Sequence, residues 1–393
     1  MITTYKSRSQ TNKKTKGSAP TKTKYHQSKQ TGNQQSRTKH SGNQKTSNQG
    51  SANKLRIIPL GGQEEVGRNM TIFEYGQDII ILDMGLQFPE EDMPGIDFII
   101  PNISYLKGKE KNIRAVIISH GHLDHIGAAP FLLEALGYPK IIARPLTLAM
   151  VKHRQEDYKK NSANLLKIIP IKKVEDTFKF GNFHVKFFQV EHSIMDAVGV
   201  QIETPVGTIL HPGDWTLEKD DTGKPQLDFS YLNKVKRPSI LMLESLGATD
   251  VRPSSSTKKM QENLYSLLKN PKGKIIVGTF ASQIERVNWI IKMAEKLGKK
   301  VILDGYSMKM NIEIAQKLGY VKPGKGTLIK AEQMKNYPDN KLVILATGAQ
   351  GEDKASLSRI LSGNHRQIRI NKQDTVVFSS SVIPGNERSI QTL

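Results

Sequence analysis

The strongest constraint on the fold is an apolar run that ends in a cluster of histidines around an aspartate. Residues 114–118 read RAVII, and residues 119–128 continue as SHGHLDHIGA. Such a run predicts a buried strand, and the apolar-periodic residues 127–137, ending on a glycine, predict a helix. Imidazole and carboxylate groups are typical ligands of zinc and related metals. The stretch therefore predicts a strand, a metal-binding turn and a helix in succession.

The spacing within the turn favours a site for two ions. His120 and His122 are two residues apart, so extended backbone projects them to the same side. Asp124 and His125 follow where the chain turns into the predicted helix. An isolated histidine is more often a packed or surface residue. Four ligand-type groups on one turn favour metal binding, and they need not converge on a single ion.

Two different patterns of apolar and polar residues along the chain indicate two layered regions. Residues 54 to about 245 contain short apolar runs broken by Gly, Asn and Asp, which predict consecutive strands in an α/β structure. From about residue 238, apolar runs alternate with amphipathic segments that stop at glycines. This alternation predicts a parallel sheet covered by helices. We place the boundary near residues 246–256, in a polar stretch.

The composition of the chain limits its expected cellular location and the kinds of molecule it can bind. The chain has 393 residues, no cysteine and a formal net charge of +21. No apolar run approaches the roughly 20 residues of a membrane span, and the absence of cysteine fits a cytoplasmic protein. Residues 1–53 are polar, basic and free of Asp and Glu, which predicts a disordered tail. Such a tail either contacts a polyanion such as RNA or acts as a solubilising extension.

Several long motifs resemble one family. LRIIPLGGQEEVGRNM, SHGHLDHIGA, GTFASQIERV, TGAQGE and SSSVIPGNE are similar, in order, to the ribonuclease J family of β-CASP nucleases, within the metallo-β-lactamase superfamily. The resemblance runs from Leu55 to Leu393. It implies an α/β fold: an incomplete metallo-β-lactamase αββα sandwich in residues 54–250, and an inserted β-CASP domain of mainly parallel sheet in residues 251–393. The tail, 1–53, lies outside it.

The resemblance also implies a ligand set. The first metal would be held by His120, His122 and His192, and the second by Asp124 and His125, with Asp214 bridging the two. Asp124 and Asp214 would also be the catalytic carboxylates. The residue types suit two Zn²⁺ ions, and Mn²⁺ is also compatible. Asp214 lies in a Pro-Gly-Asp turn, so an ordinary turn role is the alternative.

Supporting residues follow from the same resemblance. Asp83 would brace the ligand loop by hydrogen bonding, and Glu244 would orient a ligand histidine. His211 has no matching ligand role and is expected to be structural. Residues 61–69, GGQEEVGRN, are expected to be a strand-connecting turn beside the site rather than a phosphate loop.

A second set of residues is expected to bind RNA phosphates at strand ends of the second region. Arg286 and Lys309 either add positive charge there or are solvated surface groups. The phosphate-binding residues would be Thr347, Gly348, Ser380, Ser381, Gly385 and Asn386.

The implied function is a two-metal ribonuclease acting on single-stranded RNA, as a 5′-to-3′ exonuclease with endonuclease activity, in mRNA decay and rRNA maturation. Paired metal ions activate water for attack on a phosphodiester. The family also implies a homo-oligomer when full length. The alternatives are a thioester or lactam hydrolase with the same metal cluster, and a non-catalytic RNA-binding fragment.

Departures from the family pattern concern activity more than identity. Tyr306 stands where the family usually has Arg, and Ala349 where it often has Ser. The chain stops at Leu393, before the family's return strand and its last histidine ligand, so we expect a fragment that is poorly active or insoluble alone.

Overall fold

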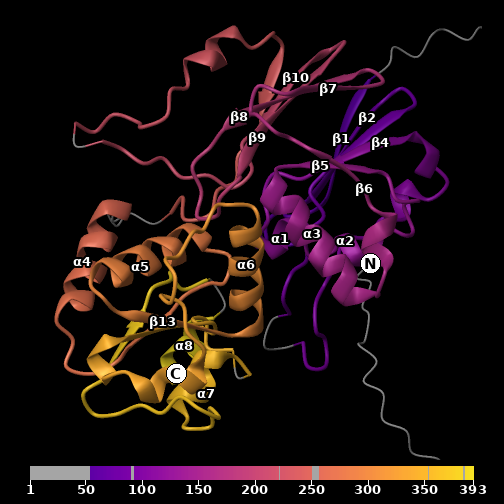
Figure 1. Cartoon of the computed structure of the whole chain (residues 1–393). Coiled ribbons are helices and arrows are strands. Elements are labelled where there is room, and N and C mark those ends of the chain that lie inside the picture. The colour runs from indigo at the N-terminus through magenta and orange to yellow at the C-terminus, as the bar shows by residue number, and fades with distance from the viewer. Residues whose placement is uncertain (1–53, 90–92, 221, 250–255, 353, 384–385) are drawn as a thin grey trace, which may run out of the picture.

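The structure is a computed structural model that describes residues 54–89, 93–220, 222–249, 256–352, 354–383 and 386–393. The predicted basic tail, most of the predicted boundary segment and Gly385 lie outside these residues. Figure 1 shows two sheets with helices beside them in one part of the molecule, and a third sheet with its own helices in the other. We call these the two-sheet part (residues 54–249) and the parallel-sheet part (residues 256–393).

The first sheet contains the predicted metal turn. It has six strands in the order β1-β2-β3-β4-β5-β6; β1, β2 and β3 are antiparallel neighbours, and β3 to β6 run parallel. The predicted strands are confirmed, and β5 and β6 extend the sheet. The strands are β1 (Leu55–Gly61), β2 (Met70–Tyr75), β3 (Asp78–Leu82), β4 (Ile113–Ile117), β5 (Lys140–Ala143) and β6 (Lys167–Pro170).

The second sheet has five strands in the order β11-β10-β9-β8-β7, antiparallel except for the parallel pair of β10 and β11. Its apolar inner face packs on the first sheet through a cluster that includes Phe73, Ile80, Phe183 and Val200. The strands are β7 (Thr177–Phe180), β8 (Phe183–Gln189), β9 (Val198–Thr204), β10 (Gly207–His211) and β11 (Ser239–Leu241).

Helices cover the outer face of the first sheet (Figure 1). They are α1 (Leu123–Ile126), α2 (Ala129–Leu132) and α3 (Pro145–Tyr158). The outer face of the second sheet instead meets the long segment between β10 and β11, around an apolar pocket of about 300 Å³ lined by residues such as Phe188, Trp215 and Leu241. The two sheets and one helical layer fit the predicted sandwich.

The predicted single helix over residues 127–137 is wrong. Of these eleven described residues, only Ala129–Leu132 form a helix, α2, because Ala128 donates its amide hydrogen to the Met84 carbonyl (2.8 Å) rather than to the preceding turn. Helix α2 has Pro130 in its first turn, and Gly137 follows the helix at a φ of +74° in the turn that leads to β5. The interruption lets the segment after β3 pair with the metal turn.

The parallel-sheet part confirms the strand–helix alternation. Its four strands lie in the order β13-β14-β12-β15 and all pairs are parallel. The strands are β12 (Ile275–Gly278), β13 (Lys300–Asp304), β14 (Leu342–Ala346) and β15 (Thr375–Phe378). The helices are α4 (Thr257–Lys269), α5 (Ile284–Lys296), α6 (Tyr306–Lys317), α7 (Ser356–Leu361) and α8 (Glu387–Thr392).

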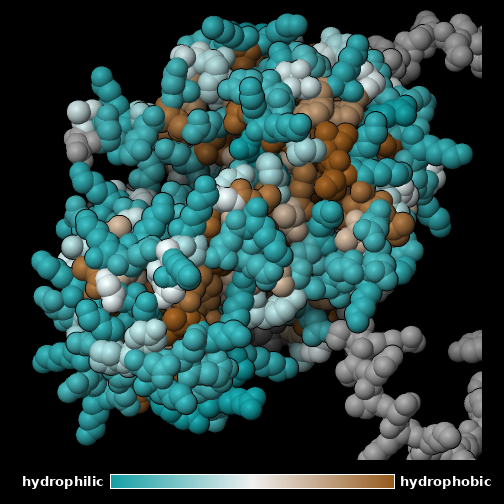
Figure 2. Space-filling view, in the orientation of Figure 1, coloured by the Kyte–Doolittle hydropathy of each residue, from teal (hydrophilic) through white to brown (hydrophobic). Residues whose placement is uncertain are grey.

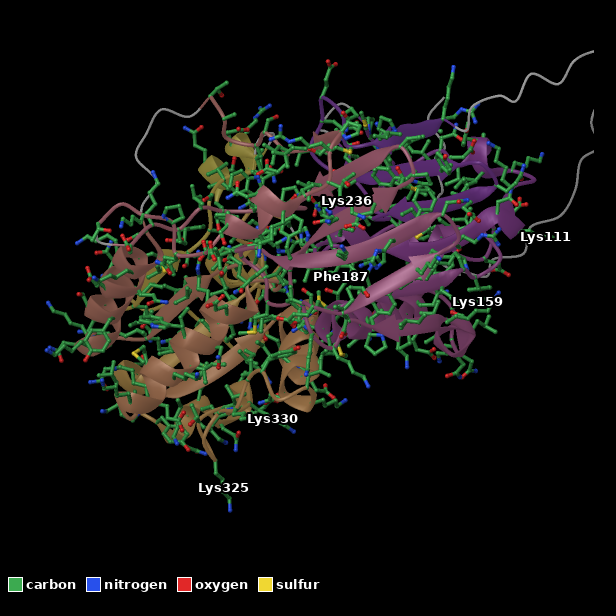
Figure 3. All side chains as sticks on the ribbon, turned by 90° about the horizontal axis from the view of Figure 1, so that it is seen from above. Lys111, Lys159, Phe187, Lys236, Lys325 and Lys330 are labelled. Carbon is green, nitrogen blue, oxygen red and sulfur yellow. The ribbon has the colours of Figure 1, made fainter. Side chains whose placement is uncertain are left out.

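One hydrophobic cluster joins the two parts. It includes Met150 and Ile194 from the two-sheet part and Met308 and Ile312 from α6. On the face drawn in Figure 2, the surface is largely hydrophilic and apolar side chains gather in small patches. In Figure 3, Phe187 of β8 lies within the molecule while Lys325 extends away from it. Among the described helices, none has the length and apolar character to cross a bilayer.

Candidate metal centre

The metal turn follows β4 and is held by the segment after β3. Met84 donates its amide hydrogen to the His125 carbonyl (2.8 Å), and Leu86 donates to the Leu123 carbonyl (3.0 Å). Gly85 lies between them, where a Cβ atom would overlap the Asp124 carbonyl. This close approach requires glycine. Backbone pairing on one side and β4 on the other therefore fix the direction of each side chain in the turn.

Four predicted ligands converge on one point. The ligand atoms of these four residues all lie within 4.8 Å of one another. The His122 Nδ1 atom lies 3.1 Å from His120 Nε2 and 3.0 Å from His192 Nε2. Asp214 Oδ2 lies 3.8 Å from both Nε2 atoms. We call His120, His122, His192 and Asp214 the first ligand group.

Asp214 also belongs to a second ligand group, with Asp124 and His125. His125 Nε2 lies 3.2 Å from Asp214 Oδ1 and 3.5 Å from Asp124 Oδ2. One oxygen of Asp214 thus faces the first group and the other faces the second. This is the arrangement that a bridging carboxylate requires.

The distances in the first group fit a transition-metal ion. Ligands about 2.1 Å from a tetrahedral ion lie about 3.4 Å apart, close to the observed 3.0 to 3.8 Å. A shared proton does not explain the arrangement, since His122 Nδ1 has two imidazole nitrogens near it and one proton joins only one pair. A cation satisfies all four groups together.

Asp83 braces this arrangement from beneath. It is buried just after β3, at a φ of +62°, a region in which Asp is tolerated better than most residues. Its carboxylate accepts hydrogen bonds from the Ser119 amide (2.8 Å) and the Ser119 hydroxyl, and its Oδ2 lies 2.8 Å from His125 Nδ1. A proton on His125 Nδ1 leaves Nε2 directed at the ligand group.

The protonation states suit metal binding by the first group. Burial, then the nearby His192, lowers the pKa of His122 to about 4. Burial also lowers the pKa of His120 and His192. These three imidazoles are therefore neutral at pH 7, which is the form that binds metal.

The second group is electrostatically different. Burial works against a charge on His125, but the carboxylates of Asp124, Asp83 and Asp214 outweigh it and raise the pKa of His125 well above its usual value. Burial likewise opposes ionisation of Asp214, yet His125 holds the pKa of Asp214 well below its usual range. The group therefore favours positive charge, supplied by a proton or by a metal ion.

Two contacts were not predicted from the sequence. Asn69, at the end of the predicted connecting turn, places Nδ2 3.2 Å from His125 Nε2 and 3.5 Å from Asp124 Oδ2. The Ser119 hydroxyl lies 3.0 Å from His120 Nδ1. For Ser119, the only signal in the sequence is a short polar side chain next to the histidine cluster. For Asn69 there is no such signal, because its partner Asp124 is 55 positions away in the sequence.

Glu244 and His211 lie near the site in different roles. Glu244 accepts a hydrogen bond from the Leu246 amide (2.5 Å), and within the described residues none joins it to a histidine. Burial, the main cause, and the nearby Asp214 raise the pKa of Glu244. His211 Nδ1 accepts from the Gly213 amide (2.9 Å) and so holds the turn before Asp214.

The predicted phosphate residues gather at the carboxyl edge of the parallel sheet. Thr347 and Gly348 follow β14, and Ser380 and Ser381 follow β15 by a residue. Gln350, which the sequence reasoning missed, is buried and joins the two loops. Its Nε2 donates to the Ser381 carbonyl (2.9 Å), and its Oε1 accepts from the Ile383 amide (2.8 Å) and the Asn386 side chain (3.4 Å).

The two cations considered for this edge differ. Arg286 lies half-buried and donates to the Gln283 side chain and the Ser379 carbonyl. Burial lowers the pKa of Arg286. Lys309 is exposed and pairs with Asp304 at 3.2 Å. Arg286 of α5 therefore holds the residue that follows β15, whereas Lys309 forms a surface ion pair.

Comparisons with known proteins agree with this architecture. The metallo-β-lactamase superfamily model matches residues 64–279, and the model of the ribonuclease J β-CASP domain matches residues 272–393. A crystal structure of a protein of unknown function from Enterococcus faecalis V583 is similar in fold, with a TM-score of 0.56 and 18% identity over 82% of this chain and 89% of that one.

Curated relatives are similar over most of the chain. Ribonuclease J of Mycoplasma pneumoniae is 36% identical over 86% of this chain and 59% of its own length. Ribonuclease J 1 of Streptococcus pyogenes is 38% identical over 87% and 60%, and ribonuclease J of Corynebacterium glutamicum is 35% identical over 86% and 47%. The chain thus spans about half to three fifths of the length of these relatives.

Proposed function

Because this chain belongs to the metallo-β-lactamase superfamily and its last 122 residues, 272–393, match the ribonuclease J β-CASP domain, we propose that it is a metal-dependent ribonuclease. Its substrate is single-stranded RNA, and the reaction is hydrolysis of a phosphodiester bond. We place this activity in the cytoplasm, and mRNA decay and rRNA maturation are the processes it would serve.

One observation carries the proposal: Asp214 shares its two carboxylate oxygens between two ligand groups. Oδ2 belongs with three histidines, and Oδ1 lies 3.2 Å from His125 Nε2. Two divalent cations bound in these groups, Zn²⁺ or Mn²⁺, would supply Lewis acidity to a phosphodiester and to water. A single structural zinc site would not need a carboxylate facing a second group.

The residues of the chain divide the remaining tasks. Asp124 is the part-exposed carboxylate of the second group, and although burial opposes its ionisation, His125 lowers its pKa. It is therefore a carboxylate at neutral pH that orients water and accepts its proton. Asp83 and Ser119 hold His125 and His120 in place from behind.

The carboxyl edge of the parallel sheet supports RNA as the substrate. Ser380, Ser381 and Asn386 offer neutral hydrogen-bond donors that suit phosphate oxygens, and Gln350 holds their loops together. Gly385 lies outside the described residues. A phosphate bound here would fit a 5′-monophosphate end, so we extend the proposal to 5′-to-3′ exonuclease action with endonuclease cleavage as a second mode.

The test measures metal content and RNA cleavage on one preparation of the chain. Asp214→Ala should lower metal affinity more than about 100-fold, since losing a residue that only supports a ligand already costs roughly 10- to 100-fold. Cleavage should fall with it. Asp228→Ala is the matched control, because Asp228 is an exposed aspartate in the same segment that bonds only Ser230 among the described residues.

Substrate choice separates the proposal from other hydrolases of the superfamily. Because the chain spans only about half to three fifths of its relatives' length, we expect weak cleavage of 5′-monophosphorylated single-stranded RNA and no turnover of a chromogenic lactam or a thioester. Turnover of either small substrate with intact RNA would overturn the proposal. If wild-type protein binds metal and RNA but cleaves neither class, the chain acts as a binding fragment.

A further inference from the structure

The histidine ligands of the first group are not equally supported. Ser119 contacts the distal ring nitrogen of His120, and Asp83 supports the neighbouring His125. His192 Nδ1 is buried and has no hydrogen-bond partner in the described part of the chain. The direction of the His192 ring therefore depends on the backbone that carries it. That backbone is the segment of residues 191–197, between β8 and β9, which we call the His192 loop.

Three anchors hold the His192 loop. At its start, the Glu191 carbonyl accepts a hydrogen bond from the Thr216 amide (2.7 Å), two residues beyond Asp214. In its middle, Ile194 is buried in the hydrophobic cluster that joins the two parts. Near its end, Asp196 is held by its carboxylate. The first anchor joins the loop to the segment that carries Asp214, whereas the third ties it to α3 and to Tyr320.

Asp196 is an unusually constrained aspartate. Its φ is +67°, and its side chain is 5% exposed. Oδ1 accepts two hydrogen bonds from the Arg144 guanidinium, each 3.3 Å. Oδ2 accepts from the Leu146 amide at the start of α3 (3.0 Å) and from the Tyr320 hydroxyl (2.7 Å). Four donors on one carboxylate fix the end of the His192 loop against α3.

Tyr320 differs from the other donors because it belongs to the parallel-sheet part. It follows α6, and its own amide donates to the Ala315 carbonyl (2.9 Å), so its backbone is fixed to that helix. Helices α3 and α6 lie side by side (Figure 1). Burial, then the hydrogen bond to Asp196, raises the pKa of Tyr320, which keeps its hydroxyl protonated and donating.

We infer that Tyr320 is a positioning residue for the metal centre: its hydroxyl, through Asp196, holds the His192 loop and so links the placement of the parallel-sheet part to the first ligand group. The inference rests on the proposed metal centre, but it concerns a residue that contacts neither ligand nor substrate. It means that the first ligand group reaches its full affinity for metal only when the parallel-sheet part is in contact with the two-sheet part.

A second tyrosine provides a matched control. Tyr306, at the other end of α6, donates from its hydroxyl to Asp157 near the end of α3 (3.2 Å). This hydrogen bond also joins the two parts, but it does not reach the His192 loop. Tyr306→Phe and Tyr320→Phe therefore each remove one hydroxyl that bonds an aspartate of the two-sheet part. Only the second removes a contact of Asp196.

The experiment titrates the 393-residue chain and both variants with Co²⁺, following the absorption bands of the bound ion and competing with a chelator. Tyr320→Phe should weaken the first bound ion about 3- to 10-fold, less than the roughly 10- to 100-fold for a group that contacts a ligand directly. Tyr306→Phe should change it less than about 2-fold. Equal affinities for Tyr320→Phe and wild type would overturn the inference.

Hydrogen exchange without metal gives an independent readout. The amides of residues 193–197 should exchange faster in Tyr320→Phe than in Tyr306→Phe, because local opening needs fewer contacts to break. If wild-type protein binds no Co²⁺, the proposed metal centre fails, and the exchange data alone then test the link to the loop. Unchanged exchange together with unchanged affinity would reduce Tyr320 to an ordinary packing residue.

Discussion

The end of β4 and the ends of β14 and β15 are both strand ends where polar side chains gather, but their chemistry is opposite. After β4, histidines and carboxylates are buried together, and Asp214 and His125 shift each other's pKa in opposite directions. After β14 and β15, the donors are hydroxyls and amides held by the neutral side chain of Gln350.

The difference shows how each site meets the cost of burying polar groups. Buried charges are stable only with partners of opposite charge, so the carboxylates of the metal turn need a positive charge, from a proton on His125 or from a metal ion. Neutral donors and acceptors pair within the protein and exchange partners at small cost when a ligand arrives. We therefore expect changes at the metal turn to have large effects and changes at the sheet edge to have small ones.

Among variants that leave every proposed ligand in place, Asp83→Asn should give the largest effect. The variant keeps the size of the side chain and tolerates the positive φ, but it removes the charge that faces His125 Nδ1. Affinity of the second ion should fall roughly 10- to 100-fold, as for other carboxylates that orient a ligand histidine. Competition with a chelator measures this.

The control is Asp78→Asn, at the other end of β3, where a buried carboxylate bonds Arg114 and Asn182 instead. It should lower the melting temperature and leave metal affinity unchanged. Similar metal loss in both variants would mean that Asp83 acts through general stability.

The pH dependence should separate the two ligand groups. Despite burial, three carboxylates raise the pKa of His125, so below that pKa a proton must leave before a metal binds. Affinity of the second ion should therefore increase with pH between pH 6 and 8, by at most about tenfold per pH unit where His125 is fully protonated. His122, with a pKa lowered to about 4, is already neutral there, so the first ion should bind equally well. Titrations at pH 6, 7 and 8 test this, and parallel slopes for both ions would contradict it.

Local patterns predicted much of this structure. The apolar runs gave β1 to β4 and the whole parallel sheet because burial and the alternation of strand and helix are written in neighbouring residues. The cluster of His120, His122 and His125 was visible for the same reason, and the structure places His192 and Asp214 beside it. That these residues bind metal remains a prediction.

What failed depends on contacts between distant residues. The helix over 127–137 was wrong because the Met84 carbonyl, more than 40 positions away, takes the Ala128 amide. Nothing near Asn69 or Tyr320 in the sequence indicates that they meet Asp124 and Asp196. That Glu244 orients a histidine stays a prediction; its hydrogen bond within the described residues is to Leu246.

Gln350→Ala should have an intermediate effect at the sheet edge. It removes the hydrogen bonds to the Ser381 carbonyl and the Ile383 amide, so the two loops lose their common support. RNA affinity should fall about 5- to 10-fold, corresponding to about 1 kcal/mol for an ordinary hydrogen bond, with metal affinity unchanged. Fluorescence anisotropy with labelled single-stranded RNA measures it. The control is Gln367→Ala, which removes an exposed glutamine bonded to Glu332. A loss of metal affinity in Gln350→Ala would show that the sheet edge and the metal centre are not independent.

Tyr306→Arg should have the smallest effect, and it tests whether charge at the sheet edge matters at all. Tyr306 is 66% exposed and follows Gly305 at the end of β13, where the resemblance leads us to expect a cation. An arginine there should strengthen RNA binding about 2- to 3-fold at low salt and steepen the dependence of log affinity on log salt by roughly 0.7, the slope for one phosphate contact on a single strand. Tyr306→Phe keeps the ring and adds no charge, so its salt dependence should match that of wild type. If Tyr306→Arg leaves the salt slope unchanged, no phosphate of the bound RNA lies close to residue 306. The neutral donors after β14 and β15 then bind the RNA backbone without a charged group on α6.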